Sequence, residues 1–129
     1  MNFNYHRIRK ENKFYLIAEI GVNHECSLIK AKKLIKLAKE GGAHAAKFQT
    51  YKAHKIVKKN SKAYWDLKKE KTKSQFELFS KLDKFKDKDY RELALYCKKI
   101  KIDFLSTPFD LEAVDTLNPL VPVFKVSSH

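Results

Sequence analysis

Short apolar segments alternate with helical segments along most of this chain, and this alternation limits its fold more than any other feature. Each apolar segment has the length and the β-branched or aromatic content of a buried strand. The expected strands are 14–21, 45–51, 103–109 and 123–128. The expected helices follow Ser27 and Ser74, begin near Asp87, and follow Asp110. Repeated βα units of this kind predict an α/β fold with a parallel sheet.

Local signals define where these helices begin and end. Ser27 has the residue type of an N-cap, and Gly41-Gly42 provides a stop. Ser74 and Glu77 match a capping box. In the last helix the spacing places Leu111, Val114 and Leu117 on the buried face.

The number of units indicates part of a barrel. A closed barrel of eight βα units needs at least ~200 residues, whereas this chain has 129. A strand at the end of a chain, with no helix over it, would leave one edge of the sheet open. We therefore expect residues 1–129 to be the N-terminal half, about four βα units, of a truncated (β/α)8 TIM barrel.

The segment from Tyr51 to Leu67 interrupts the regular spacing. It is rich in lysine, contains Tyr64-Trp65, and is too long for an ordinary βα loop. Long insertions at this position of α/β folds often cover a ligand. We expect this one to lie over a binding site, and a solvated loop is the alternative.

The formal net charge is +13, which raises the question of nucleic-acid binding. The basic residues are 25 lysines and 3 arginines, and they are spread over several segments. Proteins that recognise nucleic-acid bases and phosphates usually depend on the bidentate guanidinium of arginine. The pattern favours a solvated surface and no nucleic-acid partner.

Other function classes are limited by what the chain lacks. No run approaches the ~18 apolar residues of a membrane helix, and residues 1–13 carry no apolar segment of a secretory signal. Cys26 and Cys97 lie far apart without a metal-binding pattern. We expect a cytoplasmic protein with reduced thiols and no membrane partner.

Polar side chains stand at the ends of all four expected strands. They are Glu19 in the first strand, Lys47 and Gln49 in the second, Thr107 in the third, and Lys125 and Ser128 in the fourth. In parallel α/β folds, ligands bind at the carboxyl ends of the strands. The repetition on four strands indicates a site, although each residue alone also fits an ion pair or a helix cap.

These residue types suit an anionic ligand. Lys47 and Lys125 would act as point charges, and the hydroxyls of Thr107 and Ser128 would donate to phosphate oxygens. Two buried ammonium groups without counter-ions would cost several kcal/mol. Glu19 offsets one of them, and a bound phosphate or carboxylate would offset the other. Glu19 and Gln49 could also bind the hydroxyls of a polyol.

The ordered motifs "IAEIGVNH", "AAKFQTY", "FLSTPFD" and "FKVSS" resemble the N-acetylneuraminate (sialic acid) synthase family, which includes legionaminate and pseudaminate synthases. The segment "YWDLKKEKTKSQFELFSKLDKF" is similar to the insert that many bacterial members carry after the second strand. The resemblance implies a TIM barrel followed by an antifreeze-like domain. One departure is "NHEC", where Cys26 stands at a position that is commonly glycine.

The resemblance also implies a reaction, which is the work of a transferase that forms a C–C bond. Phosphoenolpyruvate condenses with an N-acylated hexosamine, typically N-acetylmannosamine, to give a nine-carbon nonulosonic acid and phosphate. A divalent metal, Mn or Mg, polarises the sugar aldehyde. Carbon 3 of the enol attacks the aldehyde carbon, water adds to carbon 2, and phosphate leaves by C–O cleavage.

Roles transfer to this chain motif by motif. The positions that match the family's phosphoenolpyruvate contacts are Lys47, Thr107, Lys125 and Ser128. The positions that match its amino-sugar contacts are Glu19 and Gln49. No catalytic residue is identified, and Glu19 is a candidate.

The resemblance places the family's two metal-binding histidines on later strands, and an arginine of the sugar site in the antifreeze-like domain of a partner subunit. We therefore expect no metal ligands in this chain, a homodimer in the full-length form, and a fragment that is inactive alone. His24, His44 and His54 are not expected to replace the missing ligands.

Two other functions remain as alternatives. One is another phosphoenolpyruvate-condensing aldolase that makes keto-deoxy sugar acids, which the motif pair "AEIGVNH" and "STPFD" disfavours. The other, of a different class, is a small basic module that binds nucleic acid or anions. The sequence leaves open which amino sugar is used.

Overall fold

Three parallel strands form the centre of the computed structural model, which describes residues 14–127. They are β1 (Ile17–Gly21), β2 (Ala45–Thr50) and β3 (Asp103–Pro108), in the order β1-β2-β3. β2 therefore has a hydrogen-bonded neighbour on both sides. Its Lys47 lies opposite Glu19 of β1, and its Gln49 lies opposite Thr107 of β3. The α/β fold with a parallel sheet is confirmed.

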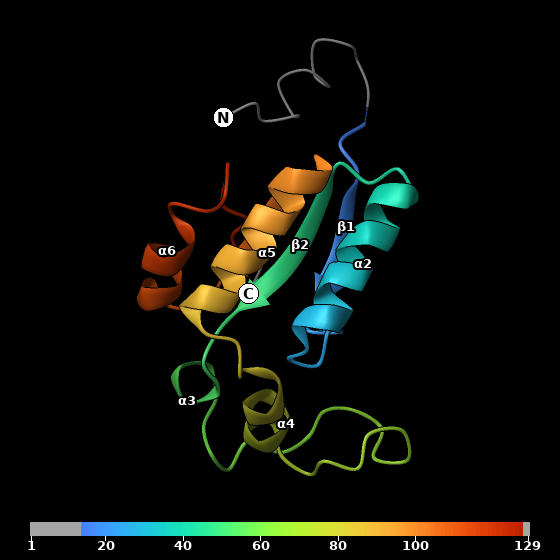
Figure 1. The fold of residues 1–129 in the computed structure, drawn as a ribbon. Coiled ribbons are helices and arrows are strands. Elements are labelled where there is room, and N and C mark those ends of the chain that lie inside the picture. The colour runs from blue at the N-terminus through green and yellow to red at the C-terminus, as the bar shows by residue number, and fades with distance from the viewer. Residues whose placement is uncertain (1–13, 128–129) are drawn as a thin grey trace.

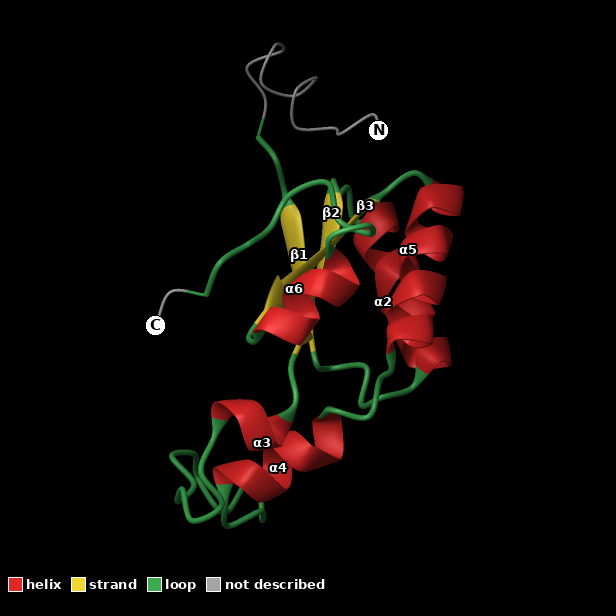
Figure 2. Cartoon of the chain, turned by 90° about the vertical axis from the view of Figure 1, so that its left-hand side faces the viewer, coloured by secondary structure: helices red, strands yellow, loops and turns green. Residues whose placement is uncertain are grey.

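Helices follow each of these strands along the chain (Figure 1). They are α2 (Leu28–Glu40), α3 (Ala53–Ile56), α4 (Gln75–Leu82), α5 (Asp87–Ile100) and α6 (Leu111–Leu117). Figure 2 shows α2 and α5 on the same side of the three strands. α6 packs against β3.

The helix boundaries follow the predicted caps. Ser27 Oγ accepts a hydrogen bond from the Lys30 amide, and Ser74 Oγ accepts one from the Glu77 amide. α2 ends at the glycine pair, where Gly42 has a φ of +84°, a left-handed conformation that costs glycine little.

α6 also begins as predicted, because the Asp110 carboxylate accepts from the Ala113 amide. The prediction for its inner face is wrong at one residue. Leu111 is exposed, whereas Ala113 and Leu117 are buried. Leu111 is the first residue of the helix, and its side chain does not lie on the helix face that packs against β3.

The main hydrophobic core lies between the sheet and its covering helices. Phe48 of β2 is fully buried there, together with Ile35 of α2 and Leu93 of α5. Complete burial of side chains this large contributes about 1.5–3 kcal/mol each to folding. This packing fixes β2 as the central and least accessible strand.

The predicted fourth strand does not form in the described part of the chain. Residues 122–127 make no strand pairing, and Val123, Phe124 and Val126 are exposed. Ser128, the last residue of that prediction, lies outside the described residues. The strand prediction is wrong for 123–127 because an apolar run becomes a strand only where neighbours bond its backbone and cover its side chains.

The insertion after β2 is longer and more ordered than a simple loop. Residues 51–86 lie beyond the carboxyl ends of the strands and include α3 and α4 (Figure 1). Within it, Lys62 pairs with Ser74, and the Trp65 indole donates to the Thr72 carbonyl at 3.0 Å. Tyr51 packs against Phe79 of α4. The position agrees with an insertion placed over the ligand-binding end of a parallel sheet.

None of the helices between residues 14 and 127 is long and apolar enough to cross a membrane.

Candidate functional site

Four of the predicted site residues share one face at the carboxyl ends of the strands. Phe48 of β2 points into the core under α2 and α5, so its neighbours Lys47 and Gln49 point to the opposite face. The register adds Glu19 from β1 and Thr107 from β3 to that face. Their spacing along separate strands therefore becomes proximity in the sheet.

Lys47 and Glu19 form the central ion pair of this face. The Lys47 Nζ lies 2.7 Å from Glu19 Oε2, with the lysine side chain 7% exposed and the glutamate side chain 65% exposed. A buried ammonium needs an opposite charge close by, because desolvation alone costs several kcal/mol. Glu19 supplies that charge from a position open to solvent. An anionic ligand entering from solvent could therefore share or replace this partner.

Gln49 and Thr107 extend the polar face towards the ends of β2 and β3. The Thr107 side chain is buried, and that of Gln49 is half-buried. An amide offers both a donor and an acceptor, and a hydroxyl offers the same in a smaller group. Lys47 thus provides one cation, and three neutral polar groups lie near it on the strands: the amide nitrogen and oxygen of Gln49 and the hydroxyl of Thr107.

The other two predicted residues are not brought to this group. Lys125 is exposed, and its Nζ donates to the Val126 carbonyl at 2.7 Å. Ser128 lies outside the described residues. Residues 122–127, which include Lys125, run on the side of the sheet away from α2 and α5 (Figure 2).

A hydrogen-bond network holds the end of β2 from the opposite face. The hydroxyls of Thr50 and Ser106 are 2.7 Å apart and buried. The Tyr90 hydroxyl donates to the Gln49 carbonyl at 3.3 Å, and burial raises the pKa of Tyr90 to about 12. Tyr90 thus stays protonated and fixes the backbone of Gln49.

His24 supports the site from the turn after β1. Its ring stacks on Phe85 at 4.3 Å and contacts Phe48, and its Nδ1 accepts from the Cys26 amide. Burial lowers its pKa from 6.5 to about 4, so the imidazole is neutral at neutral pH. Nε2 is buried without a well-formed hydrogen bond, and only a contact with the Gly21 backbone favours its charged form.

The turn also explains how Cys26 replaces the usual glycine. Cys26 has a φ of +58°, in the left-handed region where glycine is favoured. Its Sγ accepts from the Lys84 amide and contacts the Lys81 carbonyl. These contacts join the turn to the end of the insertion and help to offset the backbone strain.

The described residues do not form a metal centre by themselves. Between residues 14 and 127, no group of three or more His, Cys, Asp or Glu side chains is placed to hold a metal ion. The metal that the resemblance implies therefore has no ligand set among residues 14–127.

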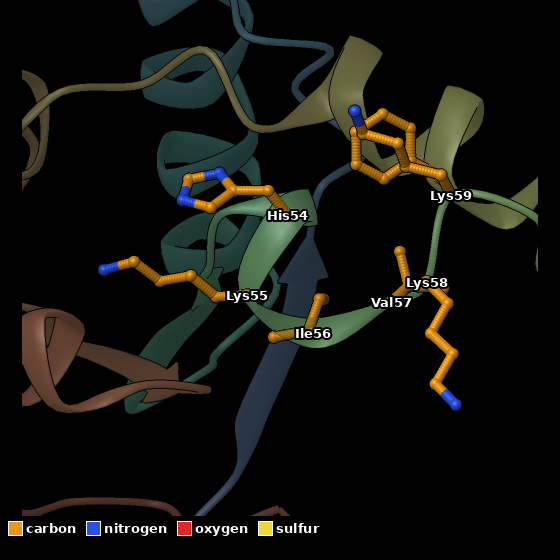
Figure 3. Close-up of a pocket in the computed structure, with 7 residues that line it drawn as sticks. His54, Lys55, Ile56, Val57, Lys58 and Lys59 are labelled. Carbon is orange, nitrogen blue, oxygen red and sulfur yellow. The ribbon is translucent and has the colours of Figure 1, made fainter.

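Two cavities lie near the insertion. One of about 450 Å³ is lined by His54, Lys55, Ile56, Val57, Lys58, Lys59 and Phe76. In Figure 3 the amines of Lys55 and Lys58 point in different directions, and Lys55 is paired with Glu112 of α6 at 2.6 Å. These amines do not converge on one ligand. A second cavity, of about 300 Å³, lies between the exit of β2, the start of α5, and α6.

Known proteins resemble this chain over most of its length. Residues 34–129 match the NeuB family. An N,N'-diacetyllegionaminic acid synthase of Campylobacter jejuni is 46% identical over 119 residues, which are 90% of this chain and 35% of the relative. The human N-acetylneuraminate-9-phosphate synthase is 41% identical over 118 residues, covering 88% of this chain and 32% of the relative.

A solved structure agrees with the fold. The N-acetylneuraminic acid (sialic acid) synthetase of Leptospira borgpetersenii, in complex with citrate, superposes with a TM-score of 0.72 at 28% identity. The match covers 87% of this chain and 35% of that protein. The chain thus spans about a third of the length of these relatives.

Proposed function

The chain belongs to the NeuB family, and from this premise we propose that it forms the first part of a (β/α)8 barrel that makes a nonulosonic acid. In the proposed reaction, carbon 3 of phosphoenolpyruvate bonds to the aldehyde carbon of an N-acylated amino sugar. Water adds to carbon 2. The bond between carbon 2 and the oxygen of the phosphate group then breaks, and inorganic phosphate leaves. The products are the α-keto acid and phosphate.

The ion pair between buried Lys47 and exposed Glu19 at the carboxyl ends of β1 and β2 carries this proposal. Lys47 offers a fixed positive charge that is shielded from water, which strengthens its attraction for a phosphate or carboxylate. When the anion binds, it becomes the partner of Lys47. Glu19 is then free to accept hydrogen bonds from the hydroxyl groups of the sugar.

Thr107 and Gln49 complete the part of the site that the described residues contain. We assign the Thr107 hydroxyl to a phosphate oxygen, because it lies across from Gln49 on the strand next to Lys47. Gln49 is assigned to the amino sugar, whose hydroxyl and amide groups match its donor and acceptor. The hydrogen bond from Tyr90 to the Gln49 carbonyl supports this orientation.

Lys125 and Ser128 are assigned to phosphoenolpyruvate on the family motif alone. For Lys125 to act beside Lys47, residues 123–128 would have to join β3 as a further strand. We propose that strands later in the barrel stabilise this arrangement in the full-length enzyme. The same enzyme would be a homodimer whose partner subunit contributes to the sugar site, and its divalent metal would be held by residues outside 14–127.

Direct binding of phosphoenolpyruvate tests the proposal. Titration of the chain, followed by NMR, is expected to shift the amides at the ends of β2 and β3 in a saturable way. Lys47→Met keeps the aliphatic stem but removes the charge, and should weaken this binding by about tenfold or more. Lys69→Met, at an exposed position of the insertion, is the matched control and should bind as the wild type does. Equal binding by wild type and Lys47→Met would overturn the assignment.

A further inference from the structure

The two ends of the insertion are joined by hydrogen bonds next to the end of β2. The Lys52 ammonium donates to the Asp83 carbonyl at 2.7 Å and to the Phe85 carbonyl at 3.1 Å. The Ala53 amide donates to the Asp83 carboxylate at 2.8 Å. Three bonds thus connect residues that are about thirty positions apart in the chain.

These bonds cap two helices reciprocally. α3 begins at Ala53, and its N-cap residue Lys52 makes no side-chain cap bond. The Asp83 carboxylate provides that bond from another segment, and a negative charge is favourable at a helix N-terminus. α4 ends at Leu82 with Asp83 as its C-cap, and the Lys52 ammonium lies on the carbonyl there. A positive charge is favourable at that end.

The same junction touches the segments that follow the two strands carrying Glu19 and Gln49. Lys52 follows Gln49 by three residues on the exit from β2. Phe85, whose carbonyl Lys52 binds, stacks on His24 in the turn after β1. Phe85 also meets the Tyr90 ring edge-on at 5.8 Å. The position of the junction therefore determines where the insertion sits relative to Glu19 and Gln49.

We propose that Lys52 and Asp83 are positioning residues that hold the insertion over the sugar side of the site. They act through backbone groups and do not touch substrate. Lys52 keeps its charge at the end of α4, and Asp83 keeps α3 in line with β2. The substrate part of this proposal rests on the proposed function; the structural part does not.

Hydrogen exchange of the ligand-free chain tests the structural part. Lys52→Met and Asp83→Ala are each expected to speed the exchange of protected amides in 53–82 by about tenfold or more. Exchange in α2 and α5 should change little. Lys52→Arg and Asp83→Asn keep a donor or an acceptor and should restore protection. Lys69→Met is the control and should leave exchange unchanged.

Ligand affinity tests the substrate part. In Lys52→Met, the affinity for N-acetylmannosamine is expected to fall more than that for phosphoenolpyruvate, because Lys47 is untouched. Lys52→Arg should recover the sugar affinity. Unchanged exchange in 53–82, or faster exchange spread equally over α2 and α5, would overturn the positioning role. Asp83→Ala, which leaves the Lys52 ammonium in place, decides the matter if Lys52→Met does not fold.

Failure of this proposal differs from failure of the proposed function. If the wild-type chain binds no phosphoenolpyruvate, the proposed function is refuted, while the exchange experiment still tests the hydrogen bonds of Lys52 and Asp83. If binding depends on Lys47 but the exchange rates of 53–82 are the same in the Lys52 and Asp83 variants as in the wild type, the proposed function is supported and the positioning role is refuted.

Discussion

Residues 45–50 and residues 123–127 have similar sequences and different structures. Each places a lysine inside a short apolar run, as "AAKFQT" and "VFKVS". The first is β2, with bonded strands on both sides and Lys47 buried against Glu19. The second forms no strand, and Lys125 is exposed. The comparison shows that the neighbours of a segment, more than its own residues, decide whether its lysine becomes a shielded charge.

The largest expected difference between the two segments is in stability. Phe48→Ala should lower the free energy of unfolding by about 3–5 kcal/mol, because it leaves a cavity in the core. Phe124→Ala should change it by no more than about 0.5 kcal/mol, because that ring is already partly in water. Urea denaturation of both variants measures the difference. Equal losses would mean that 123–127 is packed after all.

Ligand affinity should separate the two lysines next. Lys47→Met is expected to weaken phosphoenolpyruvate binding by about 1.5–3 kcal/mol, since a charge-assisted hydrogen bond in a shielded site is lost. Lys125→Met in the same chain should cost about 1 kcal/mol or less, as for an exposed charge. Calorimetric titration compares them. The opposite order would show that the C-terminal segment joins the site when ligand binds.

Lower pH should decrease the free energy of unfolding through protonation of His24. The unfolded imidazole takes up a proton near pH 6.5, whereas the folded one does so only near pH 4. The stability that His24 provides is therefore fully present above pH 6.5 and is lost as the pH falls towards 4. We expect a loss of about 1–3 kcal/mol over this range.

Chemical denaturation at several pH values measures this loss. His24→Phe keeps an aromatic ring beside Phe85 and should have a flatter pH dependence between 6.5 and 4. His54→Gln, at an exposed position of α3, should keep the wild-type slope. Identical slopes in wild type and His24→Phe would show that another group is responsible.

The last comparison between the two segments uses the wild-type chain without any substitution. Amide exchange in the wild-type chain should be slow for residues 46–49, which lie in the central strand, and close to the rate of an unstructured peptide for 123–127. Protection of 123–127 comparable with that of β2 would show that this segment is also hydrogen-bonded and shielded from water.

The sequence alone determined the local structure and the types of residue at the site. Ser27, Ser74 and Asp110 cap helices as predicted, since a cap depends on neighbours three residues away. The apolar runs at β1, β2 and β3 were also recognisable, because β-branched and aromatic residues at these lengths favour strands. Polar residues at successive strand ends predicted a ligand site, and that site stays a prediction.

Only the tertiary structure decided how distant segments meet. The register places Lys47 beside Glu19, and the chain crossing places Lys52 on the carbonyls of Asp83 and Phe85. It also leaves 123–127 without strand neighbours. Such contacts depend on the relative position of segments far apart in the sequence, which no local pattern encodes. The charge of a lysine is written in the sequence, but its burial and its partner are properties of the fold.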